Sequence, residues 1–418
     1  MNLKYTMKGS VLVVLLALLS CSTDTIEDDW KSLPTHPLAG ATDALTLNGA
    51  RAEGSVSFAA HSATEGTLTL HDVLFGREDI VMDVSLARRD DGVYLLQGET
   101  GLKDTPIPET RSEQTLYSLA AEGEIDRDGA SAIRLTTALT PEGLGGLARD
   151  YRLTTERKRG TDDETWKKVP VLVRWKAEGD HATTARAACR VMQRCLPHFL
   201  AELLRDVTLH PDGNVTVSYG ERLPGTEQME GQYMDRFLHW AEGMPDLPDE
   251  DDSYTPANNR WKPLSKHVAF WYVKGDRLYV MPHMRRFLKY LTGGTDPKSL
   301  ATWLEGQGID SAEVAEILPT LTRWLHRGIP FRYARQENGM GVKVWLDRET
   351  ADPLMRLLLT LLAQHEDRFP EPLRFDGKWA DLPEVWRHTT NFRLTFFFDT
   401  EDFINVLPWE KNEQDTTL

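Results

Sequence analysis

The sequence predicts a β-rich α+β protein built in two parts, and two patterns support this prediction. Residues 41–178 alternate apolar and polar side chains, whereas residues 180–410 combine hairpin patterns with helical ones. Alternation with a period of two places every second side chain on one face of a strand, so each such run indicates a strand with one buried face. The change of pattern near Gly179 therefore marks the expected boundary between two domains.

The first part contains about eight short alternating runs and no clear helix. The clearest run, 80–87, places Ile, Met, Val and Leu at every second position. Asp-Asp-Gly at 90–92 and Asp-Arg-Asp-Gly at 126–129 separate neighbouring runs. A glycine after aspartate supplies the positive φ of a tight hairpin. Consecutive hairpins of this kind predict an antiparallel barrel or sandwich.

The second part begins with a helical pattern over 183–204. Pro197 interrupts this pattern, so it should either kink the helix or start a second one. A hairpin around Pro-Asp-Gly-Asn follows at 207–219, and two further hairpins, 268–280 and 331–345, each lead into an apolar helical segment. This repeated order suggests a duplicated unit. The last of these helical segments carries Leu354, Leu357, Leu358, Leu361 and Leu362.

Residues 1–20 have the anatomy of a signal peptide. Lys4 and Lys8 precede an unbroken apolar run over 11–19, which is shorter than the roughly 20 residues that a transmembrane helix needs. Leu-Leu-Ser-Cys then ends the run at Cys21 and resembles the lipobox of bacterial lipoproteins. The resemblance implies that Cys21 carries a lipid and becomes the new N-terminus, anchored in the outer membrane. A signal peptide cut elsewhere and a short retained anchor are the alternatives.

An acidic, Ser/Thr-rich stretch over 22–29 follows Cys21. It resembles the surface-export signal of Bacteroidetes lipoproteins and so implies exposure on the cell surface. A plain polar tether and a periplasm-facing anchor remain alternatives. We expect residues 21–40 as a whole to form a lipidated tether, which ends in the turn-rich Pro-Thr-His-Pro at 34–37.

The charge balance excludes two classes of partner. Loss of Lys4 and Lys8 with the signal peptide takes the formal net charge from −16 to about −18. Nucleic acids are bound through Lys and Arg that neutralise phosphates, and anionic lipid surfaces attract basic segments. An acidic chain of this kind is therefore expected to dock electrostatically with neither.

Two cysteines, Cys189 and Cys195, remain after Cys21 is assigned to the lipid. They lie six positions apart in a helical pattern, so about 240° separates them around the helix axis. A disulfide cannot form across that angle within one straight helix. We expect two buried free thiols that act as small hydrophobic side chains.

No catalytic or cofactor motif is present in the sequence. The 12 histidines include no pair at metal-ligand spacing, and His365-Glu366 lacks the second histidine of a zinc protease helix. The 126–129 turn copies the start of a calcium loop but has no glutamate at the twelfth position. The acidic run 246–252 is expected to be an exposed loop, with weak calcium binding as the alternative. We therefore expect no enzyme, no cofactor and no metal site.

Three segments together resemble a set of uncharacterised Bacteroidetes surface lipoproteins of about 400 residues: the hairpin 207–219, Trp-Tyr-Val-Lys-Gly-Asp-Arg-Leu-Tyr at 271–279, and Thr-Leu-Thr-Leu at 67–70. The resemblance covers most of the mature chain and rests on turns and strands. It implies a calycin-like N-terminal β-barrel, a class that often holds apolar small molecules, although a fold does not fix a function.

The expected function is that of an outer-membrane lipoprotein that binds an apolar or amphipathic small molecule without catalysis. Such a ligand could lie inside the first part, or between the 354–362 helix and its hairpins. The alternative is a glycan-binding or protein-interaction component of a surface nutrient-uptake system, suggested by the 12 Trp and 11 Tyr. An apolar cavity would favour the first function, an exposed line of aromatic residues the second, and carboxylates clustered in a cleft an enzyme.

Overall fold

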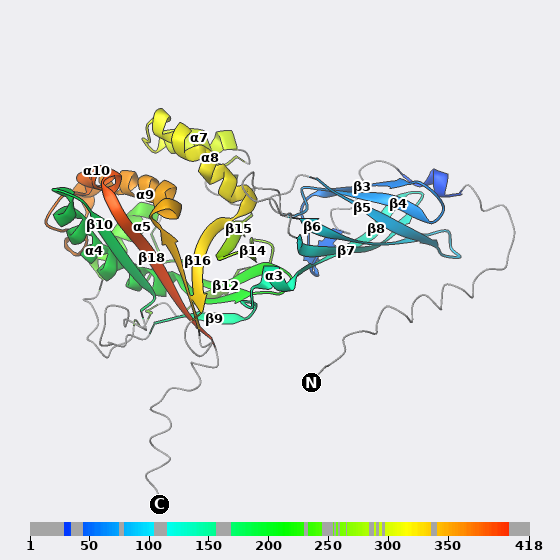
Figure 1. The fold of residues 1–418 in the computed structure, drawn as a ribbon, viewed down its shortest axis with the longest axis horizontal. Helices are drawn as coiled ribbons and strands as arrows, with labels where there is room; N and C mark the ends of the chain where they lie inside the picture. Colours follow the sequence, from blue (N-terminus) through cyan, green and yellow to red (C-terminus); the bar gives the residue numbers. More distant parts are fainter. Residues whose placement is uncertain are drawn as a thin grey trace, which may run out of the picture.

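The structure is a computed structural model of the chain. It describes residues 29–34, 45–74, 79–103, 115–155, 169–229, 233–244, 260–264, 266–283, 297–335 and 341–400, with short pieces at 254, 256–257, 288–289 and 292–294. The described strands form two sheets, and the long helices pack against the second sheet (Figure 1). The prediction of a β-rich α+β protein, with β structure first and hairpins with helices after it, is confirmed.

The first sheet has eight strands in the order β2-β1-β8-β7-β6-β5-β4-β3. Consecutive strands from β3 to β8 pair as antiparallel hairpins, while β1 lies parallel to β8. The predicted turn at 126–129 is present, and the Asp126 carboxylate accepts hydrogen bonds from the backbone of Asp128 and Gly129, at 2.8 and 3.0 Å. The strands are β1 (Leu45–Leu47), β2 (Ala50–Arg51), β3 (Ser55–Ala60), β4 (Glu65–His71), β5 (Asp79–Arg88), β6 (Tyr94–Lys103), β7 (Thr115–Asp126) and β8 (Gly129–Leu139).

The inner face of the first sheet is densely packed. Leu68, Leu119 and Ile133 on this face are each 0% exposed and belong to one continuous cluster of buried side chains. Glycines on the same face allow the neighbouring strands to approach closely. A Cβ added at Gly98 or Gly123 would lie 2.5 or 2.6 Å from a backbone oxygen of the next strand. At these positions the interior has no room for even one more methyl group.

The second sheet closes into a ring. Its order is β10-β18-β17-β16-β15-β14-β12-β11-β9, and β9 pairs with β18 as well as with β11. Eight antiparallel strands, from β18 round to β9, therefore form a closed barrel, and β10 extends it beside the first half of β18. The strands are β9 (Asp150–Leu153), β10 (Val171–Ala177), β11 (Leu204–Leu209), β12 (Asn214–Gly220), β13 (Trp261–Pro263), β14 (Ala269–Lys274), β15 (Arg277–Pro282), β16 (Ile329–Arg335), β17 (Gly341–Asp347) and β18 (Thr389–Thr400).

The sheets divide the chain earlier than the predicted boundary at 178–180. β9 and β10 lie within the predicted first domain, but both are strands of the second sheet. The change of sheet falls between Leu139, where β8 ends, and Asp150, where β9 begins. Alternation correctly indicated a strand at 171–177, yet a pattern within one strand cannot specify which sheet the strand joins.

The two sheets share a core at the predicted hairpin turn 211–214. Leu139 donates a backbone hydrogen bond of 2.9 Å to the Pro211 oxygen, and the Thr137 hydroxyl donates one of 2.7 Å to the Asp212 oxygen. The Tyr117 ring lies against Gly213, where an added Cβ would be 2.5 Å from the ring. Gly213 also has a φ of +86°, so this position requires glycine for two independent reasons.

Helices cover one end of the second sheet. α4 and α9 pack on β10, β17 and β18, while α8 packs on β15 and β16 (Figure 1). Pro197 and Pro319 lie inside α4 and α8, which continue through them, so Pro197 does not start a second helix. No helix in the described residues is long and apolar enough to span a membrane. The helices are α3 (Pro141–Leu144), α4 (His181–Leu203), α5 (Tyr233–Glu242), α7 (Pro297–Gly306), α8 (Ser311–Arg327), α9 (Arg348–Ala363) and α10 (Leu382–Arg387), with 3₁₀ turns η4 (Glu366–Arg368), η5 (Glu371–Leu373) and η6 (Trp379–Asp381).

Part of the predicted tether belongs to the folded domain. Asp29–Ser32 form the 3₁₀ turn η2, and Leu33 is 5% exposed in the core of the first sheet. Asp29 forms ion pairs with Arg88 and Arg127 of that sheet. The prediction of a tether over 21–40 is therefore wrong for residues 29–33, because one apolar side chain and one carboxylate fix this segment to the sheet.

Candidate functional site

An apolar cavity of about 550 Å³ lies between the inner face of the second sheet and helices α4, α5 and α9. This volume falls within the range of roughly 300–1,000 Å³ that is typical of small-molecule sites. The walls come from segments far apart in the sequence. Apolar lining residues include Val173 of β10, Met192 and Phe199 of α4, Phe237 of α5, Met355, Leu358 and Leu362 of α9, and Phe392 and Leu394 of β18.

The wall from α4 follows from its sequence spacing. Val191, Cys195 and Phe199 recur every four residues, so they share one face of the helix and line the cavity together. The helix is held against β10 by Gln193, whose side chain donates a hydrogen bond of 2.7 Å to the Val173 oxygen. The Val173 carbonyl faces α4, and the side-chain amide of Gln193 supplies the hydrogen bond that a neighbouring strand would otherwise give it.

The wall from β18 shows how one strand serves two interiors. Phe392, Leu394, Phe396 and Phe398 share one face of the strand because they are spaced by two. Phe392 and Leu394 pack among the helices and line the cavity, whereas Phe396 and Phe398 pack against the core shared with the first sheet. The inner face of the barrel is therefore filled by strand side chains at one end and closed by helices at the other.

Aromatic side chains stiffen the cavity walls. The Phe199 and Phe237 rings meet edge to face with centroids 5.4 Å apart, and Phe369 and Trp379 do so at 5.1 Å. The Trp379 indole N–H donates a hydrogen bond of 2.9 Å to the Leu373 oxygen. A buried indole with its one donor satisfied adds apolar surface to the wall without an unpaired polar group.

Both predicted free thiols are buried, as expected, and Cys195 lines the cavity. Burial raises the pKa of Cys189 to about 11 and that of Cys195 to about 12. The thiols are therefore protonated at neutral pH. They act as buried packing atoms rather than as nucleophiles, because the thiolate is the reactive form.

Three charged side chains line the cavity as well. Glu221 pairs with Lys262, and this hydrogen bond lowers the pKa of Glu221. The guanidinium of Arg222 donates a hydrogen bond to the Glu227 oxygen, and Arg236 of α5 is half-buried. Glu221 is thus neutralised by its lysine, and Arg222 bonds to a backbone oxygen rather than to a carboxylate.

Most of the tryptophans in the described residues belong to the core. Trp175, Trp240, Trp271, Trp324, Trp379 and Trp386 are each no more than 7% exposed. The other described tryptophans, such as Trp261 and Trp345, are partly buried. Rings that pack in the interior cannot stack on a sugar at the surface, so their placement does not support a glycan-binding face.

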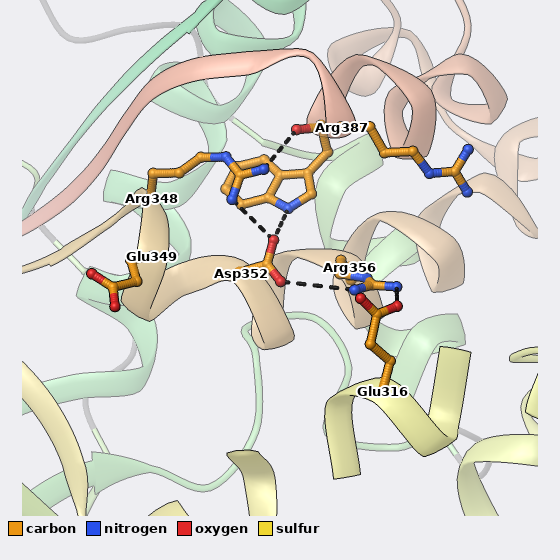
Figure 2. A pocket seen from close by; sticks show the side chains of 7 residues that line it. Glu316, Arg348, Glu349, Asp352, Arg356 and Arg387 are labelled. Atoms are coloured by element: carbon orange, nitrogen blue, oxygen red, sulfur yellow. Dashed lines mark hydrogen bonds and ion pairs between the residues drawn. The ribbon is translucent and has the colours of Figure 1, made fainter. Parts of the chain in front are cut away.

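A second hollow, a charged cleft of about 520 Å³, lies between α8, α9 and α10. Figure 2 shows Asp352 between Arg348 and Arg356, with Glu316 of α8 facing Arg356. Asp352 accepts hydrogen bonds from Arg348, at 3.1 Å, and from the Trp386 indole, at 2.9 Å. The Arg348 guanidinium also lies 4.9 Å from the Trp386 ring centroid. Ion pairs therefore join α8 to α9 in this cleft, and the Trp386 indole of α10 bonds to the same network.

Arginine holds the carboxyl group that α8 contributes to this cleft in its ionised form. Arg356 bonds to both Glu313 and Glu316, and its hydrogen bond lowers the pKa of Glu316. A general acid working at neutral pH needs a carboxyl group with a raised pKa. Among the described carboxyl groups, those with a clear shift are all lowered: Asp91, Glu221, Glu316, Asp347 and Glu384.

A third cluster contains metal-ligand side chains. His181, Glu384 and His388 meet where α4 begins and α10 ends, although sequence spacing had predicted no histidine-based metal site. The single predicted site residue, Cys21, lies outside the described residues, as does the acidic run 246–252.

Comparison of the chain with protein-family models, with curated proteins and with solved structures found no match.

Part of the cavity could be anticipated from the sequence. The 354–362 helix and an apolar interior beneath it were expected, and Leu358 and Leu362 line the cavity. The contributions of α4, α5 and β10 were missed. Each of these segments has an apolar face, but only the tertiary fold shows that the three faces point to one space.

Proposed function

We propose that this protein binds an apolar or amphipathic small molecule, without catalysis, in the cavity between the second sheet and helices α4, α5 and α9. The observation that supports this most strongly is the lining, which comes almost wholly from apolar side chains of separate elements around about 550 Å³. A ligand that fills such a space exchanges its contact with water for contact with apolar walls, which contributes about 25 cal/mol per Å² of apolar surface buried.

The charged part of the lining favours an amphipathic anion. Arg222, which donates a hydrogen bond to a backbone oxygen, lies at the cavity together with Glu221, which Lys262 neutralises. A carboxylate on the ligand would gain charge-assisted hydrogen bonds from a guanidinium, which are about twice as strong as bonds between neutral groups. A fatty acid combines an apolar chain with such a head and is the simplest probe of this class.

We further propose that the protein is a lipoprotein anchored in the outer membrane through Cys21 and exposed on the cell surface. The signal-peptide pattern, the cysteine that follows it and the acidic stretch after the cysteine support this location. Metabolic labelling with a palmitate analogue tests the anchor, since Cys21→Ala should abolish labelling. Shaving of intact cells with protease tests the surface. Alanine at Asp24, Glu27 and Asp28 should turn the anchored protein toward the periplasm.

The binding proposal is tested by titration of the chain lacking residues 1–21 with a fluorescent fatty-acid analogue. We expect saturable binding of one probe per chain at micromolar strength, which corresponds to about −8 kcal/mol. Unlabelled fatty acid should displace the probe. Absence of saturable binding would reject the small-molecule function and favour the protein-interaction alternative.

A further inference from the structure

Two histidines and a glutamate from distant parts of the sequence meet at one edge of the second sheet. One ligand atom from each of His181, Glu384 and His388 lies within 4.8 Å of those of the other two. The rings of His181 and His388 stack with centroids 4.3 Å apart and planes 11° from parallel. His388 Nε2 lies 3.1 Å from Glu384 Oε1. Among the described residues this is the one such group of three.

The sheet register brings these residues together. β10 ends at Ala177, which pairs with Thr389, the first residue of β18. His181, the first residue of α4, follows shortly after β10, and His388 immediately precedes β18. The Glu178 backbone donates a hydrogen bond of 3.1 Å to the His388 oxygen, which fixes the two chain segments at this point. The two histidines are therefore held together by backbone pairing rather than by a mobile loop.

The third ligand has a suitable position. Glu384 and His388 are four residues apart across the end of α10, a spacing that places both side chains on one face of a helical turn. Arg387 bonds to one oxygen of Glu384, and the other oxygen is directed at His388.

We propose that His181, Glu384 and His388 form a binding site for a divalent transition-metal ion such as Zn²⁺. Two imidazole nitrogens and one carboxylate oxygen are a ligand set that zinc and related metals use in proteins. Ligand atoms around a tetrahedral zinc ion lie about 3.3 Å apart, so atoms already within 4.8 Å reach it by small side-chain rotations. Glu384 and His388 have side chains 50% and 42% exposed, so the ion enters from solvent and retains water at its remaining position.

The bound metal would connect α4 to α10 and β18. A ligand that binds the folded state and not the unfolded chain raises the apparent stability. The site is separate from the apolar cavity, whose lining from α4 begins at Val191. The metal proposal therefore stands or fails independently of the proposed small-molecule function.

The test is calorimetric titration of ZnCl₂ into the full chain, prepared without a histidine tag and dialysed against EDTA. We expect one ion per chain with a micromolar or tighter Kd. His181→Ala and His388→Ala should each weaken binding at least about tenfold. His239→Ala is the matched control, because His239 has a single carboxylate neighbour, Glu242, at 3.5 Å and lies in no group of three ligands. The zinc affinity of the His239→Ala variant should equal that of the wild type.

Thermal unfolding provides the second measurement. Saturating zinc should raise the melting temperature of the wild type and the control by about 3 °C or more, and leave both ligand variants unchanged. Melting in EDTA shows whether each variant folds. If His388→Ala does not fold, His388→Gln, which keeps a polar side chain at this position, replaces it. Absence of zinc binding by the wild type, or wild-type affinity in folded ligand variants, would overturn the proposal.

Discussion

The two sheets bury their apolar faces in different ways. In the first sheet the inner face is a single packed cluster, in which an added Cβ at Gly98 or Gly123 would collide with the neighbouring backbone. In the second sheet the inner face is open at one end, and helices close it over a cavity of about 550 Å³. When consecutive strands pair, a large side chain on one strand can lie opposite a glycine on the next, so the interior fills. Helices that cover the open end of a barrel leave space between their bulky side chains.

Under the proposed function, this difference favours the second half of the molecule as the location of the ligand. The resemblance to calycin-like barrels suggested the first sheet as one possible container, but its inner face shows the close packing of a structural core. The first sheet is joined to the second through Tyr117 and the turn at Gly213. Adding or removing volume in each half tests this division directly.

The largest effect is expected from adding volume to the first interior. Gly98→Ala places a methyl group 2.5 Å from the Asp83 backbone oxygen, so the strands must separate. We expect a loss of about 1–3 kcal/mol in the free energy of unfolding. The midpoint of urea unfolding measures it. Gly306→Ala, at the end of α7 with nothing within 4 Å of the added atom, should cost nothing; an equal loss in both variants would contradict close packing at Gly98.

Adding volume to the second interior should instead affect binding. Leu358 lines the cavity and is 43% exposed, while Leu354 lies one turn earlier on α9, is 39% exposed and does not line it. Leu358→Trp should weaken binding of the fatty-acid probe at least about tenfold, equivalent to about 1.4 kcal/mol, without loss of folding stability. Leu354→Trp is the matched control and should bind normally. Equal weakening in both variants would place the ligand on the exposed face of α9 instead of in the cavity.

The contact between the halves should contribute a smaller effect. The Tyr117 hydroxyl donates a buried hydrogen bond of 2.5 Å to the Trp271 oxygen. Tyr117→Phe keeps the ring against Gly213 but leaves that oxygen without this donor, so we expect a loss of about 1 kcal/mol in the free energy of unfolding. Urea unfolding monitored by tryptophan fluorescence measures the loss, and an unchanged midpoint would mean that this hydrogen bond contributes nothing to the stability of the contact.

The smallest effect concerns the two buried thiols. Because burial raises the pKa of Cys195 to about 12 and that of Cys189 to about 11, the reactive thiolate is scarce at pH 8 and increases as the pH rises toward those values. The folded protein should therefore resist iodoacetamide at pH 8, while the urea-unfolded chain reacts at both cysteines. Mass spectrometry counts the added groups, and rapid labelling of the folded protein would mean that the cavity admits water freely.

Local features of the fold could be predicted from the sequence, because they depend on neighbours in the chain. Alternation at 80–87 and the Asp-Gly turns identified the strands and hairpins of the first sheet, and the helical pattern over 183–204 matches α4 closely. The α4 helix continues through Pro197. Because proline has no backbone N–H, the carbonyl of Gln193, four residues earlier, loses its helical hydrogen bond. These outcomes reflect periodicity and turn chemistry, which act over a few residues.

Features that depend on distant pairing could not be predicted. β9 closes the barrel by pairing Tyr151 with Thr400, and no pattern within either segment specifies the other. The same limit explains why the domain boundary was placed too late and why the histidine cluster was missed. His181 and His388 have no ligand spacing in the sequence, and they meet only because β10 and β18 are neighbours.

The most direct test of the central claim is photocrosslinking with a fatty acid that carries a diazirine near the end of its chain. The purified chain is irradiated with the probe, digested, and the labelled peptides are identified by mass spectrometry, with excess unlabelled fatty acid as the control for specificity. If the second half holds the ligand, competable label falls on α4 or α9, within 191–203 and 355–362. Competable label within 45–139, on the strands of the first sheet, would contradict the account.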